Sequence, residues 1–161
     1  MDAPSVKNPG RFITLEGGEG AGKSTQIQVI KDYLLTRGND VVVTREPGGT
    51  SEGQEIRNLL VSGDKDKWSP LSETLLILAD RAAHLERLIR PALADGKYVV
   101  CDRFFDSTKA YQGVAGGLGL DVINNLQQPV LGTTLPDFTL LLDIDPEKGL
   151  RRAQERGGEL R

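Results

Sequence analysis

The chain is poor in the residue types that form disulfides, metal clusters and covalent catalytic centres. It contains one cysteine, Cys101, and one histidine, His84, and only 5% of its 161 residues are aromatic. A single cysteine excludes an internal disulfide and favours a reducing compartment. Neither residue has a partner at the spacing of a metal site or of a nucleophile and its base, so we expect both to pack in the interior.

Long apolar runs and an excess of positive charge are also missing. The longest strongly apolar stretch, residues 75–79, is far too short to span a bilayer. Residues 1–10 are polar, contain two prolines and lack the apolar centre of a signal peptide, so we interpret them as a loose leader. The net charge of −3 offers no electrostatic footprint for a nucleic-acid backbone. We therefore expect a cytoplasmic protein whose partners are neither membranes nor nucleic acids.

The remaining composition is typical of one globular domain spanning residues 1–161, with 38% hydrophobic and 27% charged residues. Short apolar runs that do not alternate with polar residues predict buried strands at 12–16, 41–44, 98–101 and 138–142. Helical spacing predicts helices at 23–37, 51–60, 71–94, 122–131 and 146–156. Pro91 should bend or end the third helix, because proline lacks the N–H donor. The polar, glycine-rich segment 104–119 is expected to contain some helix.

Strands that alternate with helices predict an α/β fold, a mostly parallel sheet with helices on both faces. No strand or helix closes the chain after residue 156, so we expect the sheet to be incomplete. The fold class that fits best is the three-layer sandwich of the P-loop NTPases, because of the loop that follows the first strand.

Residues 17–24 form a complete phosphate-binding loop of the pattern G-x-x-x-x-G-K-[ST], placed between a predicted strand and a predicted helix. Its glycines let backbone N–H groups converge on phosphate oxygens, and the helix that follows adds its positive N-terminal end. Lys23 can bridge the β- and γ-phosphates, and the Ser24 hydroxyl is a natural Mg²⁺ ligand. We predict an ATP site made of Gly17, Gly18, Glu19, Gly20, Ala21, Gly22, Lys23, Ser24 and Thr25.

Two further segments follow predicted strands, at the sheet edge where parallel sheets bind ligands. Asp102 can hold Mg²⁺ through water and Arg103 can clamp a phosphate, although the pair alone also fits a loop salt bridge. The segment 44–50 reads Thr-Arg-Glu-Pro-Gly-Gly-Thr. Its proline and glycines fix a turn that leaves Arg45 able to reach a phosphate, or else form a plain surface turn.

Weaker signals come from helical segments. Arg81 shares a helix face with Ile77 and either points into a cleft or is solvated, and Arg57 is similar. Polar groups spaced along about one helical turn can read the edge of a base or simply form a polar helix surface; these are Ser107, Thr108, Tyr111 and Gln112. A basic cluster near the end of the chain can close over phosphates or complement a helix C-terminus; it consists of Arg151, Arg152 and Arg156.

Four segments, in this order and spacing, resemble the bacterial thymidylate kinases: residues 15–25, 44–50, 102–104 and 110–113. The phosphate loop alone indicates only a superfamily, whereas T-R-E-P-G-G-T followed by D-R and A-Y-Q-G is much more specific. The resemblance implies transfer of the ATP γ-phosphate to dTMP with Mg²⁺, in a homodimer that packs long helices together. It also implies that the family continues beyond Arg161, through a mobile lid, at which this chain stops, and a last strand and helix.

The resemblance also implies residue roles. Lys23, Arg103 and the lid residue Arg156 would be catalytic, and Ser24 and Asp102 would lie at Mg²⁺. Arg45 and Arg103 would hold the dTMP phosphate, helped by Arg81 and Arg57. Glu19 would face the sugar, Tyr111 would lie against it, and Thr108 and Gln112 would contact the thymine edge. Family members often carry an aromatic near positions 77–78, where this chain has Ile77 and Leu78. Hydrogen bonds and apolar contact are therefore expected to hold the base.

Two alternatives remain at this stage. One is a P-loop nucleoside or nucleotide kinase with a different acceptor. The other is an ATP-hydrolysing switch protein, which we would expect to carry a clear acidic strand end and a water-orienting group. The arginines on the acceptor side favour a second anionic substrate.

Overall fold

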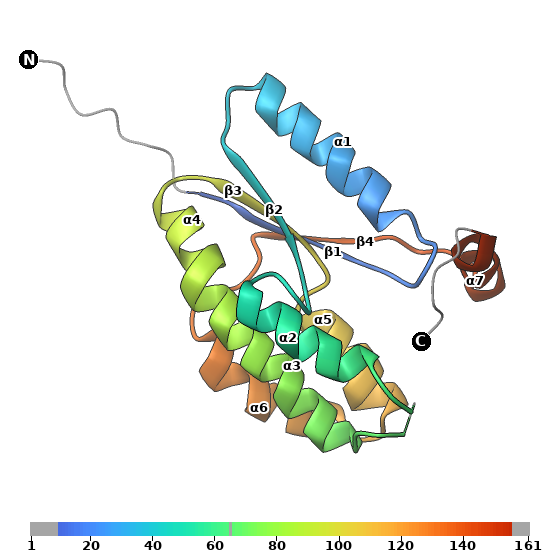
Figure 1. Cartoon of the computed structure of the whole chain (residues 1–161). Coiled ribbons are helices and arrows are strands. Elements are labelled where there is room, and N and C mark those ends of the chain that lie inside the picture. Colours follow the sequence, from blue (N-terminus) through green and yellow to red (C-terminus); the bar gives the residue numbers. More distant parts are fainter. Residues whose placement is uncertain (1–9, 65, 156–161) are drawn as a thin grey trace, which may run out of the picture.

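The computed structural model describes residues 10–64 and 66–155. Within these residues, one sheet of four strands has the order β2-β3-β1-β4 (Figure 1). The strands are β1 (Phe12–Glu16), β2 (Val41–Arg45), β3 (Tyr98–Asp102) and β4 (Phe138–Leu141). The α-helices are α1 (Lys23–Thr36), α2 (Ser51–Val61), α3 (Pro70–His84), α4 (Arg90–Ala94), α5 (Phe105–Thr108), α6 (Leu120–Leu131) and α7 (Pro146–Glu155). Two π-helical segments complete the set, η1 (Leu85–Ile89) and η2 (Lys109–Ala115).

All paired strands are parallel, as predicted. Their register brings the carboxyl ends of β1, β2 and β3 to one edge, where Leu15 and Arg45 both lie opposite Asp102. Because each of these strands is followed by a loop at that edge, three loops distant in sequence meet there. The site is therefore positioned by the sheet register.

The sheet carries an apolar core on each face. On one face, Phe12 and Val99 pack with Leu85, Ile89 and other side chains of η1, α4 and α6. On the other face, Leu15 and Val100 pack against α1. Figure 1 shows α1 on one side of the sheet and α3, α4 and α6 on the other. The prediction of an α/β fold with helices on both faces is thus confirmed.

The long helix does not end at Pro91, which was one of the two outcomes expected there. It neither stops at Pro91 nor remains a regular α-helix, because η1 joins α3 to α4. In this π-helical turn, the Arg90 N–H donates to the Leu85 carbonyl, five residues back. The wider turn directly before the proline accommodates the missing donor, so the chain stays helical to Ala94.

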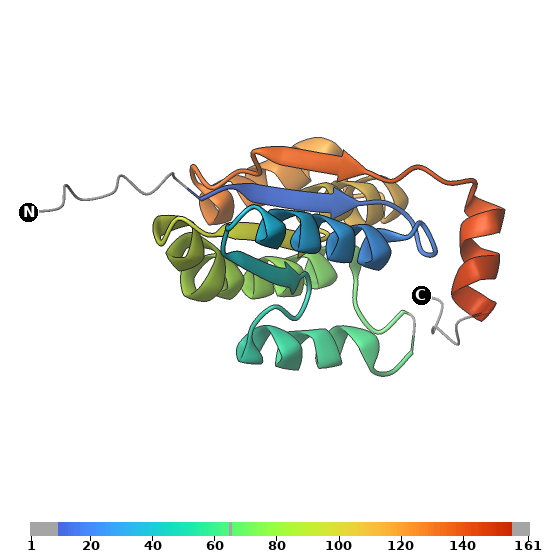
Figure 2. The same cartoon turned by 90° about the horizontal axis from the view of Figure 1, so that it is seen from above.

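The other elements begin and end within about two residues of their predicted bounds. No helix among the described residues is long and apolar enough to cross a bilayer. Figure 2 shows α7 beyond the carboxyl edge of the sheet, beside the loop that follows β1.

Candidate active site

The loop after β1 depends on glycine at two positions. Gly20 has a φ of 72°, and a Cβ there would overlap the carbonyl oxygen of Gly149 in α7. Gly22 is the N-cap of α1, with a φ of 95° and no side chain to occupy the first N–H groups of the helix. The loop therefore presents backbone donors and a helix N-terminus to the same space, an arrangement suited to an anion.

Lys23 lies over this loop. Its Nζ donates to the carbonyl oxygens of Gly17, at 2.9 Å, and Gly18, at 3.0 Å. Burial lowers the pKa of Lys23, and the neighbouring Arg103 lowers it further, while Asp102 and Glu19 oppose this shift. The hydrogen-bond partners of the ammonium are thus neutral carbonyl groups, which do not cancel its positive charge. This charge can therefore attract a phosphate bound at the loop.

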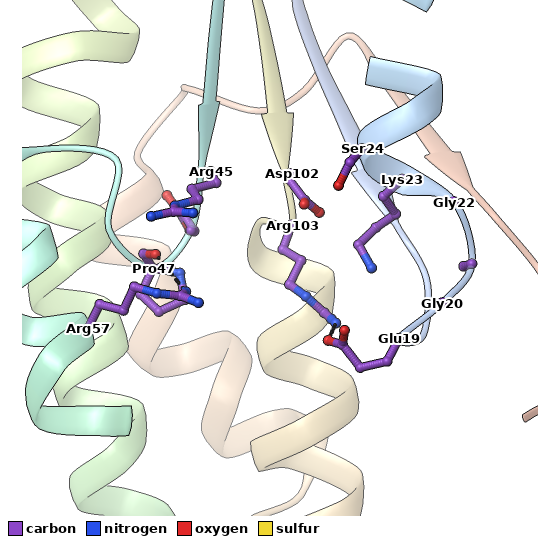
Figure 3. Close-up of a pocket in the computed structure, with 12 residues that line it drawn as sticks. Glu19, Gly20, Gly22, Lys23, Ser24, Arg45, Pro47, Arg57, Asp102 and Arg103 are labelled. Carbon is purple, nitrogen blue, oxygen red and sulfur yellow. Dashed lines mark hydrogen bonds and ion pairs between the residues drawn. The ribbon is translucent and has the colours of Figure 1, made fainter. Parts of the chain in front are cut away.

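A cavity of about 250 Å³ opens in front of the loop (Figure 3). The loop lines one side of it, and the ends of β2 and β3 line the other. The lining residues are Glu19, Gly20, Ala21, Gly22, Lys23, Ser24, Arg45, Glu46, Pro47, Arg57, Asp102 and Arg103. Gly17, Gly18 and Thr25 belong to the same loop and helix start but do not line this cavity.

Asp102 and Ser24 are the two predicted metal ligands, and both line the cavity. Asp102 Oδ1 is buried and has no hydrogen-bond partner among the described residues. Burial raises the pKa of Asp102, against the opposing effect of Lys23 and Arg103. An unsatisfied carboxylate oxygen beside a hydroxyl suits a hard cation that keeps some of its water. The described residues contain no cluster of three or more His, Cys, Asp or Glu able to hold a metal.

The backbone at Arg103 is left-handed, with a φ of 66°, which is unusual for a residue with a side chain. Glu16, at the end of β1, holds this turn. Its two carboxylate oxygens accept hydrogen bonds from the Phe104 N–H, at 2.8 Å, and the Ser107 hydroxyl, at 2.6 Å. Burial raises the pKa of Glu16, while these two hydrogen bonds lower it. The carboxylate that precedes the phosphate loop therefore fixes the turn that carries Arg103.

The Arg103 side chain reaches back across the cavity. Its Nη2 donates to Glu19 Oε1 at 2.7 Å, and its Nη1 donates to the Tyr111 hydroxyl at 3.2 Å. The guanidinium carbon also lies 5.1 Å from the centre of the Tyr111 ring. Arg103, Glu19 and Tyr111 thus form one contiguous group, and their roles at the acceptor phosphate and sugar stay predictions.

A second cavity, of about 200 Å³, shares part of its wall with the first. Residues that line both cavities are Glu19, Glu46, Pro47, Arg57 and Arg103. The second cavity adds apolar side chains, among them Ile77 and Phe104, and the polar residues Thr108 and Gln112. A flat, partly apolar molecule with polar edge groups fits such a lining.

Arg81 lies at the second cavity and does not line the first. Its side chain is almost fully buried, with 1% exposed, and its guanidinium carbon lies 5.0 Å from the centre of the Phe104 ring. It donates to Glu46 Oε2 and Gln127 Oε1, each at 2.7 Å, and to Thr108 Oγ1 at 3.1 Å. We predicted Arg81 as a helper at the acceptor phosphate. It contacts Thr108 in the second cavity and Glu46 on the wall that both cavities share, and its role stays a prediction.

The other predicted arginines have different environments. Arg45 is exposed and donates to Gln54 Oε1 at 3.3 Å, while Arg57 donates to the Pro47 carbonyl at 3.1 Å. Both line the first cavity, facing the phosphate loop. Arg156, the predicted lid residue, lies outside the described residues.

Sequence reasoning missed three residues that organise the site: Glu16, Glu46 and His84. Glu16 and Glu46 each directly follow or end a strand at the ligand-binding edge, a position that would have indicated a role. His84 and Cys101 are fully buried, as expected, but His84 also hydrogen-bonds to Thr44 and Glu46. Its spacing of three residues from Arg81, on one helix face, was the available signal.

Comparison with known proteins agrees with this geometry. The family model for thymidylate kinase matches residues 15–161. A thymidylate kinase of Caulobacter vibrioides is 55% identical over 152 residues, which cover 94% of this chain and 73% of that protein. A thymidylate kinase of Desulfosudis oleivorans is 54% identical over 145 residues, covering 90% of this chain and 68% of that protein.

A solved structure gives the same result and bears out the predicted P-loop-type α/β fold. The crystal structure of thymidylate kinase from Ehrlichia chaffeensis superposes with a TM-score of 0.79 at 41% identity, covering 91% of this chain and 84% of that one. Matches of this extent and identity, on a chain whose loop after β1 shares a cavity with Arg45 and Arg103, establish the relationship. The chain belongs to the thymidylate kinase family.

Proposed function

We propose that this chain transfers the γ-phosphate of ATP to dTMP, giving ADP and dTDP. The observation that carries the proposal is the pair of adjoining cavities, one lined by the phosphate loop and one by apolar and polar groups suited to a base. Arg103 and Glu46 belong to both walls, so two nucleotides bound there would meet at their phosphates. In the reaction, the bond between the γ-phosphorus and its bridging oxygen breaks, and a bond to a dTMP phosphate oxygen forms.

The donor side supplies positive charge. Backbone donors of the loop and the start of α1 would face the triphosphate, and Lys23 would add its ammonium. Such groups neutralise charge on the transferring phosphoryl and its leaving group, which is the main task of phosphoryl-transfer enzymes. The acceptor phosphate is already anionic at neutral pH, so the transfer needs no protein base.

On the acceptor side, Arg45, Arg57 and Arg103 present guanidinium groups to the first cavity. They are suited to holding the dTMP phosphate in line with the donor, since guanidinium groups bind phosphate oxygens in pairs. Glu19 and Tyr111 would face the sugar, a role that their shared contact with Arg103 supports. Thr108, Gln112 and Arg81 would read the base edge, with Ile77 and Phe104 as apolar walls.

Mg²⁺ is part of the proposal. Ser24 and Asp102 would hold it, and the unsatisfied Asp102 Oδ1 is the observation that favours this site. The ion would supply positive charge at the β- and γ-phosphates. We also propose that Arg156 acts as a lid arginine on the transferring group, where such residues contribute on the order of 10³-fold or more.

A cytoplasmic homodimer completes the proposal. The low cysteine content favours a reducing compartment. Helix α3 exposes Leu71 and Leu75, at 45% and 51% of their surface, and such apolar side chains suit a subunit interface. Multi-angle light scattering would give the mass in solution, and a monomer at working concentration would contradict this part.

The function is tested by ADP release with ATP and single nucleoside monophosphates. We expect dTMP to be the preferred acceptor, with dCMP much poorer because its 4-amino group cannot accept the hydrogen bonds that a carbonyl accepts. Equal rates with dTMP and dCMP, or ADP release that needs no acceptor, would contradict the proposal. The second outcome would instead favour the ATP-hydrolysing switch.

A further inference from the structure

His84, the last residue of α3, is completely buried and contacts the end of β2 and the residue that follows it. Its Nδ1 lies 2.9 Å from Glu46 Oε1, and its Nε2 lies 2.7 Å from Thr44 Oγ1. A carboxylate only accepts hydrogen bonds, so Nδ1 carries a proton and donates to Glu46. Nε2 forms its hydrogen bond with the Thr44 hydroxyl, a group that can either donate or accept. Both ring nitrogens therefore bind the same segment, residues 44–46.

Glu46 links His84 to Arg81, because each of its carboxylate oxygens bonds to one of them. Its second carboxylate oxygen accepts from Arg81 Nε at 2.7 Å, and the Glu46 side chain is itself buried. Arg81 in turn contacts Gln127 and Thr108, which fix both ends of its guanidinium. A connected series of polar contacts thus runs from His84 through Glu46 and Arg81 to Thr108, at the second cavity.

The segment after β2 is packed tightly against the same face of α3. A Cβ on Gly49 would overlap the imidazole ring of His84, so the ring has no room to move toward the loop. One turn earlier on α3, Asp80 Oδ1 accepts the Gly48 N–H at 3.0 Å. Asp80, Arg81 and His84 therefore dock the helix against the acceptor segment, and the burial makes a change in any one contact costly.

We propose that His84 is a positioning residue for the acceptor site. Its hydrogen bond fixes the Glu46 carboxylate in the rotamer that holds Arg81, and Arg81 then presents its donors to the nucleobase. Without His84, Glu46 loses one of its two buried hydrogen-bond partners, so its carboxylate holds Arg81 Nε less firmly and the guanidinium can shift relative to Gln127 and Thr108. The inference rests on the proposed function, because it assumes that dTMP occupies the second cavity.

The kinetic test compares three variants of the chain with the wild type. His84→Leu removes both ring hydrogen bonds, whereas His84→Asn keeps a donor near the position of Nδ1. Thr74→Val is the matched control, because Thr74 is equally buried on α3 but bonds only to the Pro70 carbonyl of its own helix. We expect His84→Leu to raise the KM for dTMP about tenfold or more, with the KM for ATP within about twofold. His84→Asn should recover part of the loss, and Thr74→Val should behave as wild type.

A second measurement does not depend on turnover. His84 is the chain's one histidine, so its ring signals in a long-range ¹H–¹⁵N NMR spectrum need no assignment by mutation. We expect the spectrum of the tautomer protonated at Nδ1, and we expect Glu46→Gln to shift the Nδ1 signal. Adding dTMP should also move this signal, while adding ATP alone should not.

If His84→Leu does not fold, Thr44→Val replaces it as the test. This variant removes only the hydrogen bond to His84 Nε2 and should raise the KM for dTMP alone.

The outcomes separate the two proposals. If the wild type does not phosphorylate dTMP, the proposed function fails. If it does, an equal rise in both KM values, no rise in either, or a ring signal insensitive to Glu46→Gln overturns the role of His84. In that case the histidine only fills the core.

Discussion

Arg103 Nη2 lies 2.7 Å from Glu19 Oε1, so an ion pair joins the acceptor side to the phosphate loop (Figure 3). Glu19 is half exposed, and such a pair adds little to the stability of the fold. Its consequence is geometric, because it holds the Arg103 side chain at the wall that the two cavities share.

Arg103→Ala should therefore impair binding of the acceptor much more than binding of the donor. We expect the KM for dTMP to rise about 100-fold, because a phosphate-holding charge is lost, and the KM for ATP to change little. Steady-state kinetics with each substrate varied in turn measures the split. Arg37→Ala, at the exposed end of α1, is the control and should leave both constants unchanged. A similar rise in both constants would count against the assignment of Arg103 to dTMP.

Lys23→Ala should abolish turnover while the fold survives. The Lys23 ammonium carries a burial cost that lowers its pKa, so its removal should not destabilise the protein. We expect kcat to fall at least about 100-fold, since a charge that stabilises the transferring group is lost. ADP release measures the rate and circular dichroism the melting temperature. Lys31→Ala, farther along α1, is the matched control. Normal turnover in Lys23→Ala would show that this lysine does not act on the phosphates.

Glu16→Gln should act on the acceptor through the turn at Arg103. The amide keeps an oxygen for one of the two donors, but its NH₂ group cannot accept the second hydrogen bond. We expect the KM for dTMP to rise about fivefold and Ser107→Ala to have a smaller effect in the same direction. If Glu16→Gln instead raises the KM for ATP equally, the carboxylate acts on the phosphate loop that follows it.

Asp80 should give the protein a measurable pH dependence. Burial raises its pKa above the ordinary value of 3.8, and the nearby Glu46 adds to this, while the Gly48 N–H opposes it. The folded state therefore binds the proton more tightly than the unfolded state. The free energy of unfolding should fall as pH rises from 3.8 through the raised pKa, and stay lower above it. Asp80→Asn should flatten this slope, measured by urea unfolding at a series of pH values.

Asp137 provides the control of opposite sign. The Phe12 N–H lowers its pKa, so its stabilising contribution is present above 3.8 and is lost as pH falls. Asp137→Asn should remove stability at neutral pH and little in acid. An unchanged slope in Asp80→Asn would mean that its carboxyl group titrates alike in both states.

The sequence was sufficient to predict those parts of the fold and of the site that depend on residues close together in the chain. The phosphate loop, the parallel strands and the arginines near strand ends could be predicted because glycine spacing, apolar runs and β-strand ends are short-range signals. The burial of Arg81 could not, because its partners Glu46 and Gln127 come from segments 35 and 46 residues away in the sequence. The continuation of the helix past Pro91 likewise depends on a π-helical turn that no residue pattern announces.

The contact between Gly20 and Gly149 makes the donor loop a product of both ends of the described chain. A fragment that ended before Pro146 would retain the complete phosphate-loop sequence, residues 17–24. It would lose the Gly149 carbonyl group, against which Gly20 packs. The signature alone is thus not sufficient to form the triphosphate cradle, and α7, which lines neither of the two cavities, helps to shape it.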